Sequence, residues 1–269
     1  MLSWLIKNGK RILMCILVGM LLLTNVGNAE TNDYCGYTIG NTSKIEESIP
    51  MWQQRECSIV IRPGEYANDD YVKEGKRVYV DDLNWSKIPT DIPIRKDNQG
   101  NHFISEHDIN VKISKRLYQE LIDRGVSVKY QDTYNRKEDL NAAGRKANES
   151  NPNIYLSIHT NSWKSDSSGY FLMYNPGDDM GKNIAQRLND SISGNGMIPQ
   201  NSNRENTEHY IGELSTLNKS TVGLLAELGY FSGTEGNGDL YYLLSDEYAD
   251  YVAVHMADEL VNVLNSYWD

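Results

Sequence analysis

Four side chains that can bind a metal ion or move a proton occupy positions where a fold could bring them together. Glu65 follows a short apolar run, Glu106 opens a helical pattern, His159 ends a second apolar run, and Glu227 lies within a third. A carboxylate in an apolar strand is costly to bury without a partner, so Glu227 requires compensation. A divalent metal ion, or a water molecule that it holds, would supply it. Carboxylates combined with imidazole favour zinc, Zn²⁺.

Each of these residues also has a purely structural interpretation. Glu106 could be a first-turn acid that the helix dipole stabilises. His159 could be a core histidine with satisfied hydrogen bonds, Glu227 could pair with a buried arginine, and Glu65 could be a surface residue in a turn. These alternatives stay open for each residue alone, but the combination is harder to explain without a shared site.

The elements that must position these residues follow from the hydrophobic pattern. Apolar β-branched runs predict strands at 58–62, 126–130, 154–159, 170–174 and 222–228. Four-residue spacing predicts a helix from Glu106 that ends at Gly125, and further helices near 138–149, 178–193 and 247–264. The stretch 66–102 is predicted as a hairpin-like insertion with strands at 77–80 and 91–94.

Alternating strands and helices predict an α/β fold, a single domain with a twisted, mostly parallel sheet and helices on both faces. In such sheets ligands gather at the carboxyl ends of the strands. Glu65, His159 and Glu227 are at or near strand ends in this arrangement, and Glu106 begins a helix. The predicted fold therefore places the four residues at one edge of the sheet.

The N-terminal residues have the pattern of a secretory signal peptide. Lys7, Lys10 and Arg11 precede an apolar run at 12–23, and small residues at 27–29 suit a cleavage site. The run is shorter than the roughly 18 residues of a spanning helix, although an uncleaved anchor is the alternative. The predicted organisation is a signal peptide at 1–29, a tail at 30–56 and a catalytic domain at 57–269. The predicted location is secreted or cell-envelope.

Charge and cysteine content limit the other possibilities. The formal net charge of -11 argues against a nucleic-acid partner bound by general electrostatics. Outside the predicted signal peptide only Cys35 and Cys57 remain, which is too few for a cysteine-built zinc site. An exported pair could form a disulfide, and two free thiols are the alternative.

Five motifs together resemble those of the zinc-dependent N-acetylmuramoyl-L-alanine amidases in order and spacing. They are Ile-Val-Ile-Arg-Pro-Gly-Glu at 59–65, Glu-His-Asp-Ile-Asn at 106–110, Ala-Asn at 147–148, Ser-Ile-His-Thr-Asn at 157–161, and Glu-Leu-Gly-Tyr-Phe-Ser at 227–232. The resemblance implies a peptidoglycan hydrolase that cleaves the amide between N-acetylmuramic acid and L-alanine of the stem peptide. It also implies that Glu106 and His159 are zinc ligands and that Glu227 is the catalytic acid/base.

The chain departs from the family in its first loop. The family usually reads Asp-Pro-Gly-His-Gly-Gly, whereas this chain has Arg-Pro-Gly-Glu-Tyr-Ala at 62–67. Glu65 therefore stands in for a histidine ligand, and a carboxylate can still bind zinc. Zn²⁺ with two carboxylates sums to zero charge instead of +1, which predicts a weaker Lewis acid. We further expect an ion pair between Arg62 and Asp132, the reverse of the family's arrangement.

Metal-assisted amide hydrolysis is thus the predicted function, with peptidoglycan as the substrate. The Asn-, Ser- and Gly-rich loops at 161–169 and 193–208 are expected to line the substrate groove. A catalytically impaired protein that binds or regulates the cell wall is the alternative. A metallocarboxypeptidase-like hydrolase is disfavoured because no His-x-x-Glu pair occurs in a suitable context. The sequence does not identify an activating protein partner.

Overall fold

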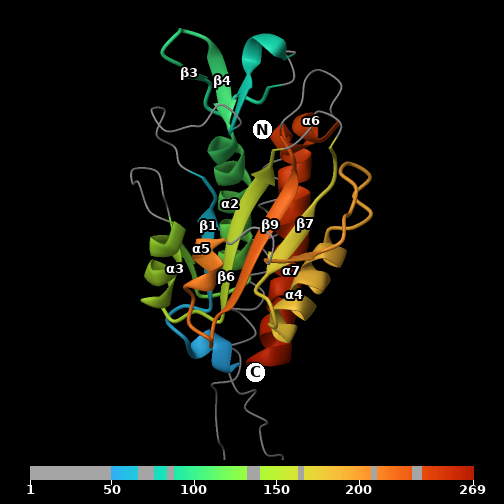
Figure 1. The fold of residues 1–269 in the computed structure, drawn as a ribbon. Coiled ribbons are helices and arrows are strands. Elements are labelled where there is room, and N and C mark those ends of the chain that lie inside the picture. Colours follow the sequence, from blue (N-terminus) through green and yellow to red (C-terminus); the bar gives the residue numbers. More distant parts are fainter. Residues whose placement is uncertain are drawn as a thin grey trace, which may run out of the picture. The chain divides into compact units, whose positions relative to one another are not determined.

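Six strands form the central sheet, in the order β5-β1-β6-β9-β7-β8 (Figure 1). Their bounds are Val128–Tyr130 for β5, Ile59–Pro63 for β1, Ile154–Asn161 for β6, Val222–Tyr230 for β9, Phe171–Tyr174 for β7 and Arg204–Glu205 for β8. All neighbours pair in parallel except β7 and β9, which are antiparallel. The predicted mostly parallel sheet is confirmed.

The structure, a computed structural model, describes residues 50–65, 76–83, 88–131, 140–162, 167–206, 211–231 and 238–269. The predicted signal peptide, Cys35 and most of the predicted tail lie outside the described residues, as does Asp132. Cys57 is buried, and its thiol donates to the Ile59 carbonyl. Because Cys35 lies outside the described residues, the disulfide between Cys35 and Cys57 stays a prediction. Within the described ranges, none of the helices combines the length and apolar character needed to cross a bilayer.

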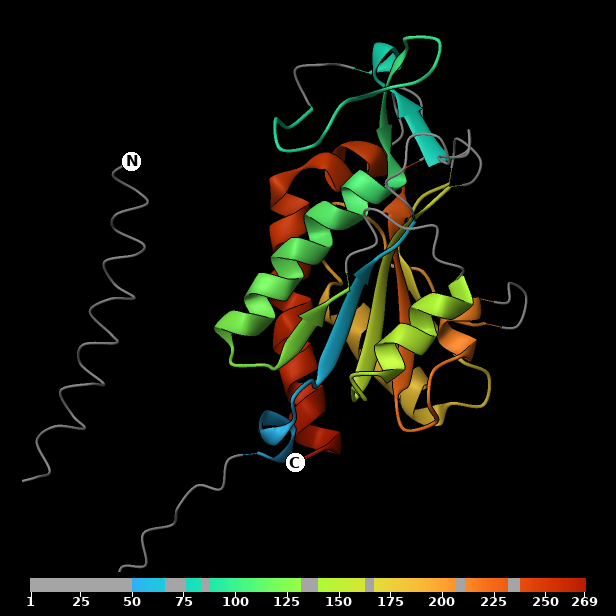
Figure 2. The ribbon, with the colours of Figure 1, turned by 90° about the vertical axis from the view of Figure 1, so that its left-hand side faces the viewer.

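Helices cover both faces of the sheet, as predicted (Figures 1 and 2). On the first face, α2 (Glu106–Asp123), α4 (Asp179–Ser191) and α7 (Asp246–Tyr267) pack into one apolar core with Ile59 and Ile61. On the second face, α3 (Leu140–Asn148) and α5 (Gly212–Ser215) contribute to a smaller apolar cluster with Val60. Alternate residues of each strand point to opposite faces, so one strand serves both cores.

The start of α2 is strongly determined, which matters because Glu106 is its first residue. The Ser105 hydroxyl accepts from the Asp108 amide in a capping box. Arg95 donates two hydrogen bonds of 2.7 Å to the Asp108 carboxylate. At the other end, Gly125 has a φ of 77°, a conformation that glycine adopts without strain. The predicted helix start is confirmed, and its cap fixes where the Glu106 side chain begins.

The insertion between β1 and α2 differs from its prediction. It contains a three-stranded antiparallel sheet in the order β2-β4-β3, with β2 at Arg77–Tyr79, β4 at His102–Ser105 and β3 at Arg95–Lys96. The short 3-10 helix η3 (Val80–Asp82) follows β2, so the strand predicted at 77–80 is one residue too long. The strand predicted at 91–94 is wrong, because the chain turns there and Pro93 has no amide hydrogen for a ladder.

Four short elements were not predicted besides β3, β4 and η3. They are η1 (Met51–Gln54), β8, α5 and α6 (Gly238–Leu244). Elements of two to seven residues carry too little periodicity to be recognised from sequence. One of them, α5, supplies a residue to the site described next.

Candidate metal centre

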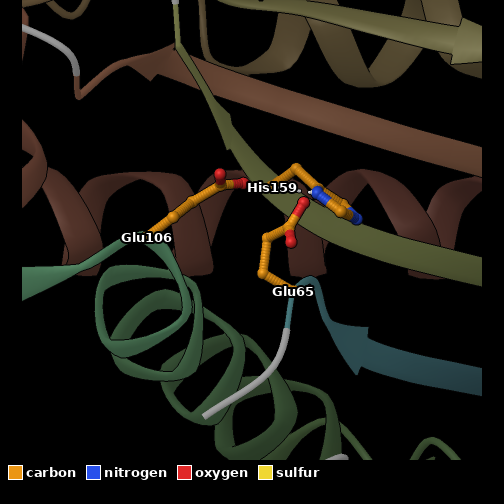
Figure 3. A group of neighbouring side chains, drawn as sticks. All are labelled: Glu65, Glu106 and His159. Atoms are coloured by element: carbon orange, nitrogen blue, oxygen red, sulfur yellow. Dashed lines mark ion pairs between the residues drawn. The ribbon is translucent and has the colours of Figure 1, made fainter. Parts of the chain in front are cut away.

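Three of the predicted residues converge at the carboxyl end of the central sheet (Figure 3). Glu65 follows β1, Glu106 begins α2, and His159 lies near the end of β6. One ligand atom from each of them lies within 4.8 Å of the other two. Residues from distant parts of the sequence thus offer two carboxylates and one imidazole to a single point.

The spacing of these atoms suits a metal ion. His159 Nδ1 lies 3.4 Å from Glu106 Oε1. In a tetrahedral site with metal–ligand distances of about 2.0–2.2 Å, neighbouring ligand atoms stand roughly 3.3–3.6 Å apart. The Glu106 side chain is only 1% exposed, so its charge requires a cation nearby. The donor set, its spacing and its burial all fit a divalent ion such as zinc.

Gly64 allows the His159 ring to lie where it does. A Cβ at position 64 would stand 2.3 Å from two atoms of the imidazole, closer than any side chain tolerates. The next residue, Glu65, has a φ of 60°, which is uncommon for a residue other than glycine. The Pro-Gly turn after β1 is therefore shaped around the imidazole, and its left-handed residue turns a carboxylate toward the same point (Figure 3).

Lys76, which the sequence analysis did not single out, touches both carboxylates. Its Nζ lies 2.6 Å from Glu106 Oε2 and 3.2 Å from Glu65 Oε1. Burial by itself would lower the pKa of Lys76, but the negative charges of Glu106 and Glu65 raise it above its ordinary value. Lys76 is therefore a fixed positive charge at the site. Lysine in a polar stretch before β2 gives no sequence signal for this role.

Glu213 is a second residue that the sequence analysis missed. It comes from α5, and its Oε1 lies 3.4 Å from His159 Nε2, on the opposite side of the ring from Glu106. Its Oε2 accepts hydrogen bonds of 2.8 Å from Arg62 and from the Tyr155 hydroxyl. Arg62 and Glu213 are fully buried. Burial alone would raise the pKa of Glu213, but Arg62 and His159 lower it to about 2, so Glu213 stays ionised.

The buried arginine pairs with an acid that the sequence analysis did not name. The described partner of Arg62 is Glu213, whereas Asp132, its predicted partner, lies outside the described residues. The Arg62–Asp132 pair stays a prediction. An arginine in a strand that is otherwise apolar was itself the signal that a buried acid must lie opposite, because an unpaired buried charge is costly.

Glu227 lies beside His159 on the neighbouring strand. The two residues pair in the register of β6 and β9, so their side chains point to the same face about 5 Å apart at the backbone. Glu227 Oε2 is fully covered and has no hydrogen-bond partner among the described residues. Burial raises the pKa of Glu227, the positive charge of His159 lowers it, and the negative charge of Glu106 raises it further. The resulting pKa is about 7. Near neutral pH, Glu227 can both accept and release a proton.

The charge state of His159 shows how the chain compensates its own acids. Burial would lower the pKa of His159, but hydrogen bonding with Glu106 and Glu213 and the charges of Glu213 and Glu227 raise it to about 10. The imidazolium and Lys76 together balance the acidic cluster. A metal ion must displace the imidazole proton to bind, as is general for histidine ligands.

The other histidines of the described residues serve different purposes. His107 is buried, and its Nδ1 lies 2.9 Å from the Gly64 carbonyl and 3.1 Å from that of Glu65. His107 thus supports the turn that carries Glu65. His255 packs against Tyr251, and His102 lies in β4. His209 lies outside the described residues.

One of the two loops predicted to bind substrate lines a hollow. Residues 200–203 and α4 enclose a cavity of about 390 Å³ beside Tyr174, lined by Lys182, Gln186, Asn189 and Asp190. Its lining contains none of the four predicted site residues. Part of the other loop, 163–166, lies outside the described residues. A substrate groove at these loops therefore stays a prediction.

Comparison with protein families gives a match to the N-acetylmuramoyl-L-alanine amidases over residues 91–262, more than half of the chain. Glu106, His159 and Glu227 lie inside the matched segment, and Glu65 precedes it. A comparison with curated protein sequences gives no match.

Several solved structures have the same fold. AmiC2 of Nostoc punctiforme, an N-acetylmuramoyl-L-alanine amidase, is 23% identical with a TM-score of 0.54, covering 78% of this chain and 97% of that one. The catalytic domain of CwlV from Bacillus (Paenibacillus) polymyxa var. colistinus is 16% identical with a TM-score of 0.57, covering 78% and 98%. The Clostridioides difficile CwlD amidase, in complex with the GerS lipoprotein, is 17% identical with a TM-score of 0.54, covering 78% and 99%.

Proposed function

Because the chain belongs to the N-acetylmuramoyl-L-alanine amidase family, we propose that Glu65, Glu106 and His159 hold its metal ion, that this ion is zinc, and that Glu227 is the catalytic acid/base. The family is metal-dependent, and its reaction is hydrolysis of the amide between N-acetylmuramic acid and L-alanine in peptidoglycan. The observation that carries the proposal is the meeting of the three ligand atoms within 4.8 Å, with Glu227 in register beside His159.

The residues of the chain divide the chemistry between them. When bound, the ion supplies Lewis-acid polarisation and makes a water molecule more acidic. Glu227 takes a proton from the attacking water and returns it to the departing alanine nitrogen, so that one carboxylate serves both steps. A pKa near 7 suits this double role, because both protonation states are then populated at neutral pH.

Glu213 and Arg62 support the site at the Nε2 atom of His159. Glu213 faces Nε2 of His159 and so favours the tautomer that keeps Nδ1 free for a metal ion. Arg62 and Tyr155 hold both the charge and the position of Glu213. This chain of contacts extends from the ligand to two strands of the sheet, which keeps the imidazole in one orientation.

Location and partners belong to the same proposal. Peptidoglycan lies outside the cytoplasmic membrane, so the enzyme acts in an extracytoplasmic place, with residues 1–29 as its signal peptide. The CwlD amidase was solved in complex with the GerS lipoprotein. That similarity identifies no protein partner for this chain, so the proposed hydrolysis is assigned to the purified chain alone.

The test is an incubation of the purified protein with peptidoglycan, with and without added zinc. New L-alanine amino termini should appear with zinc, and Glu227→Gln should abolish them. Glu205→Gln is a matched control, because Glu205 is an exposed glutamate of β8. Zinc bound in a one-to-one ratio without any new L-alanine termini would contradict the amidase assignment. A protein that retains no metal would instead favour a wall-binding role.

A further inference from the structure

Lys76 places a positive charge between the two carboxylates of the proposed metal site. Its Nζ lies 2.6 Å from Glu106 and 3.2 Å from Glu65. Its side chain is 31% exposed, whereas that of Glu106 is 1% exposed. The ammonium therefore reaches the buried carboxylate from the solvent side, and it contacts Glu65 on the way.

Lys76 contacts only one of the two oxygens of the Glu106 carboxylate. Lys76 contacts Oε2 of Glu106, whereas His159 Nδ1 lies 3.4 Å from Oε1. An ion bound between Oε1 and the imidazole does not require the ammonium to leave Oε2. Lys76 and His159 thus contact different oxygens of the Glu106 carboxylate.

The charges of the site explain why such a lysine matters. A divalent ion with Glu65, Glu106 and His159 sums to zero, whereas the same ion with two neutral histidines and one carboxylate sums to +1. Adding the Lys76 ammonium brings the first arrangement to +1 as well. Net positive charge at the ion is what strengthens its Lewis acidity.

We infer that Lys76 is a positioning residue that offsets the extra negative charge of Glu65, so that the two residues act as a compensating pair in the metal site. This inference rests on the proposed metal-dependent function. The expectation from sequence that Glu65 weakens the metal centre counted only the ligands, and under this inference Lys76 offsets that weakening.

The first test measures zinc affinity by competition with a chelator, without any assay of activity. Removing a cation beside the ion should tighten binding, so Lys76→Met should bind zinc at least about tenfold more tightly. Lys76→Arg keeps the charge and should stay close to the wild type. Lys182→Met, at an exposed lysine of α4, is the control. Equal or weaker zinc binding by Lys76→Met would overturn the inference, because a merely structural lysine acts in that direction.

The second test exchanges the charges. Lys76→Met alone lowers the site charge from +1 to zero and should slow peptidoglycan cleavage, whereas Glu65→His alone raises the site charge. The double variant returns to the starting charge and should recover most of the rate. A double variant no better than the worse single variant would contradict the pairing. Lys76→Gln repeats the experiment if Lys76→Met does not fold, as judged by its circular dichroism melt.

The two tests separate the inference from the proposed function. If the wild type and the variants bind zinc in the predicted order of affinity but the wild type cleaves no peptidoglycan, the hydrolytic function fails. The pairing of Glu65 with Lys76 then stands. If it cleaves peptidoglycan and Lys76→Met has no tighter zinc binding, the function stands and the pairing fails.

Discussion

Ile61, Ile158 and Ala226 point to one face of the central sheet. The residues that follow them in the sequence, Arg62, His159 and Glu227, point to the other face. The first face packs against α2, α4 and α7 in a continuous apolar core. The second face carries a buried ion pair, a charged histidine and a carboxylate with an uncompensated oxygen. The same three strands therefore build the stable core and the site, one residue apart.

This difference shows how a reactive cluster can be kept in a folded protein. Buried charges are costly to desolvate, and a buried ion pair contributes little net stability compared with apolar residues of similar size. The large apolar core of the first face, together with the smaller apolar cluster of the second, supplies the stability that the buried charges do not. We therefore expect substitutions on the two faces to separate activity from stability.

The largest separation is expected for Glu227→Gln. Loss of the proposed acid/base should lower the cleavage rate by about a thousandfold, in the range for general acid–base catalysis. The folded-state pKa of about 7 lies above the ordinary value of 4.5, so stability falls as the pH rises from about 4.5 to 7. Glutamine lacks this loss and should be more stable by about 3 kcal/mol above pH 7. Cleavage assays measure the loss of activity, and urea unfolding of both proteins at pH 5 and pH 8 measures the difference in their free energy of unfolding. A difference that is the same at both pH values would contradict the predicted effect on stability.

Glu213→Gln should damage both properties. It removes the described carboxylate partner of the buried Arg62, which costs about 4 kcal/mol, and it removes the carboxylate that faces Nε2 of His159. Because the folded-state pKa of Glu213 is lowered to about 2, its contribution is present above about pH 4.5 and is lost as the pH falls toward 2. Urea unfolding at pH 6 and pH 3 should show the variant's deficit shrinking at the lower pH. A deficit that is the same at both would contradict the role of the charge.

Leu260→Ala tests the other face. Leu260 of α7 is fully buried in the apolar core, so truncation should lower the free energy of unfolding by about 3 kcal/mol. Well below the melting temperature, zinc affinity and cleavage rate should stay near those of the wild type. A loss of zinc affinity comparable to that of Glu213→Gln would show that the two faces are not separable.

The smallest effect is expected at the cap of α2. Ser105→Ala removes the side-chain acceptor of the capping box and should cost about 1 kcal/mol in thermal unfolding. Because Glu106 is the next residue, zinc affinity should weaken slightly as well. Ser105→Thr keeps the hydroxyl and is the matched control. Wild-type zinc affinity in Ser105→Ala would mean that the cap stabilises α2 without positioning its first residue.

The sequence predicted the elements that have strong periodicity. Ile109, Ile113, Leu117 and Leu121 predicted α2, and all four are fully buried. Glu65, Glu106 and His159 were found because each lies at the end of such an element, where α/β sheets gather their ligands. The hydrophobic periodicity, together with the polar residues at the ends of the predicted elements, was sufficient to predict α2 and to single out these three residues.

Lys76 and Glu213 were beyond the reach of the same reasoning. Lys76 comes from an insertion whose strands were partly misplaced, and Glu213 comes from a helix of four residues. Their roles depend on contacts across 30 residues to Glu106 and 151 residues to Arg62. Only Arg62 carried a usable signal, since a cation in a buried strand requires an acid opposite.

The most direct test of the central claim is anomalous X-ray diffraction at the zinc edge, from crystals of the zinc-loaded protein. The account predicts one peak per chain, about 2.0–2.2 Å from a carboxylate oxygen of Glu65, a carboxylate oxygen of Glu106 and Nδ1 of His159. Glu227 should lie beside it, within reach of a bound water molecule. A peak held by other residues, or none at this edge of the sheet, would contradict it.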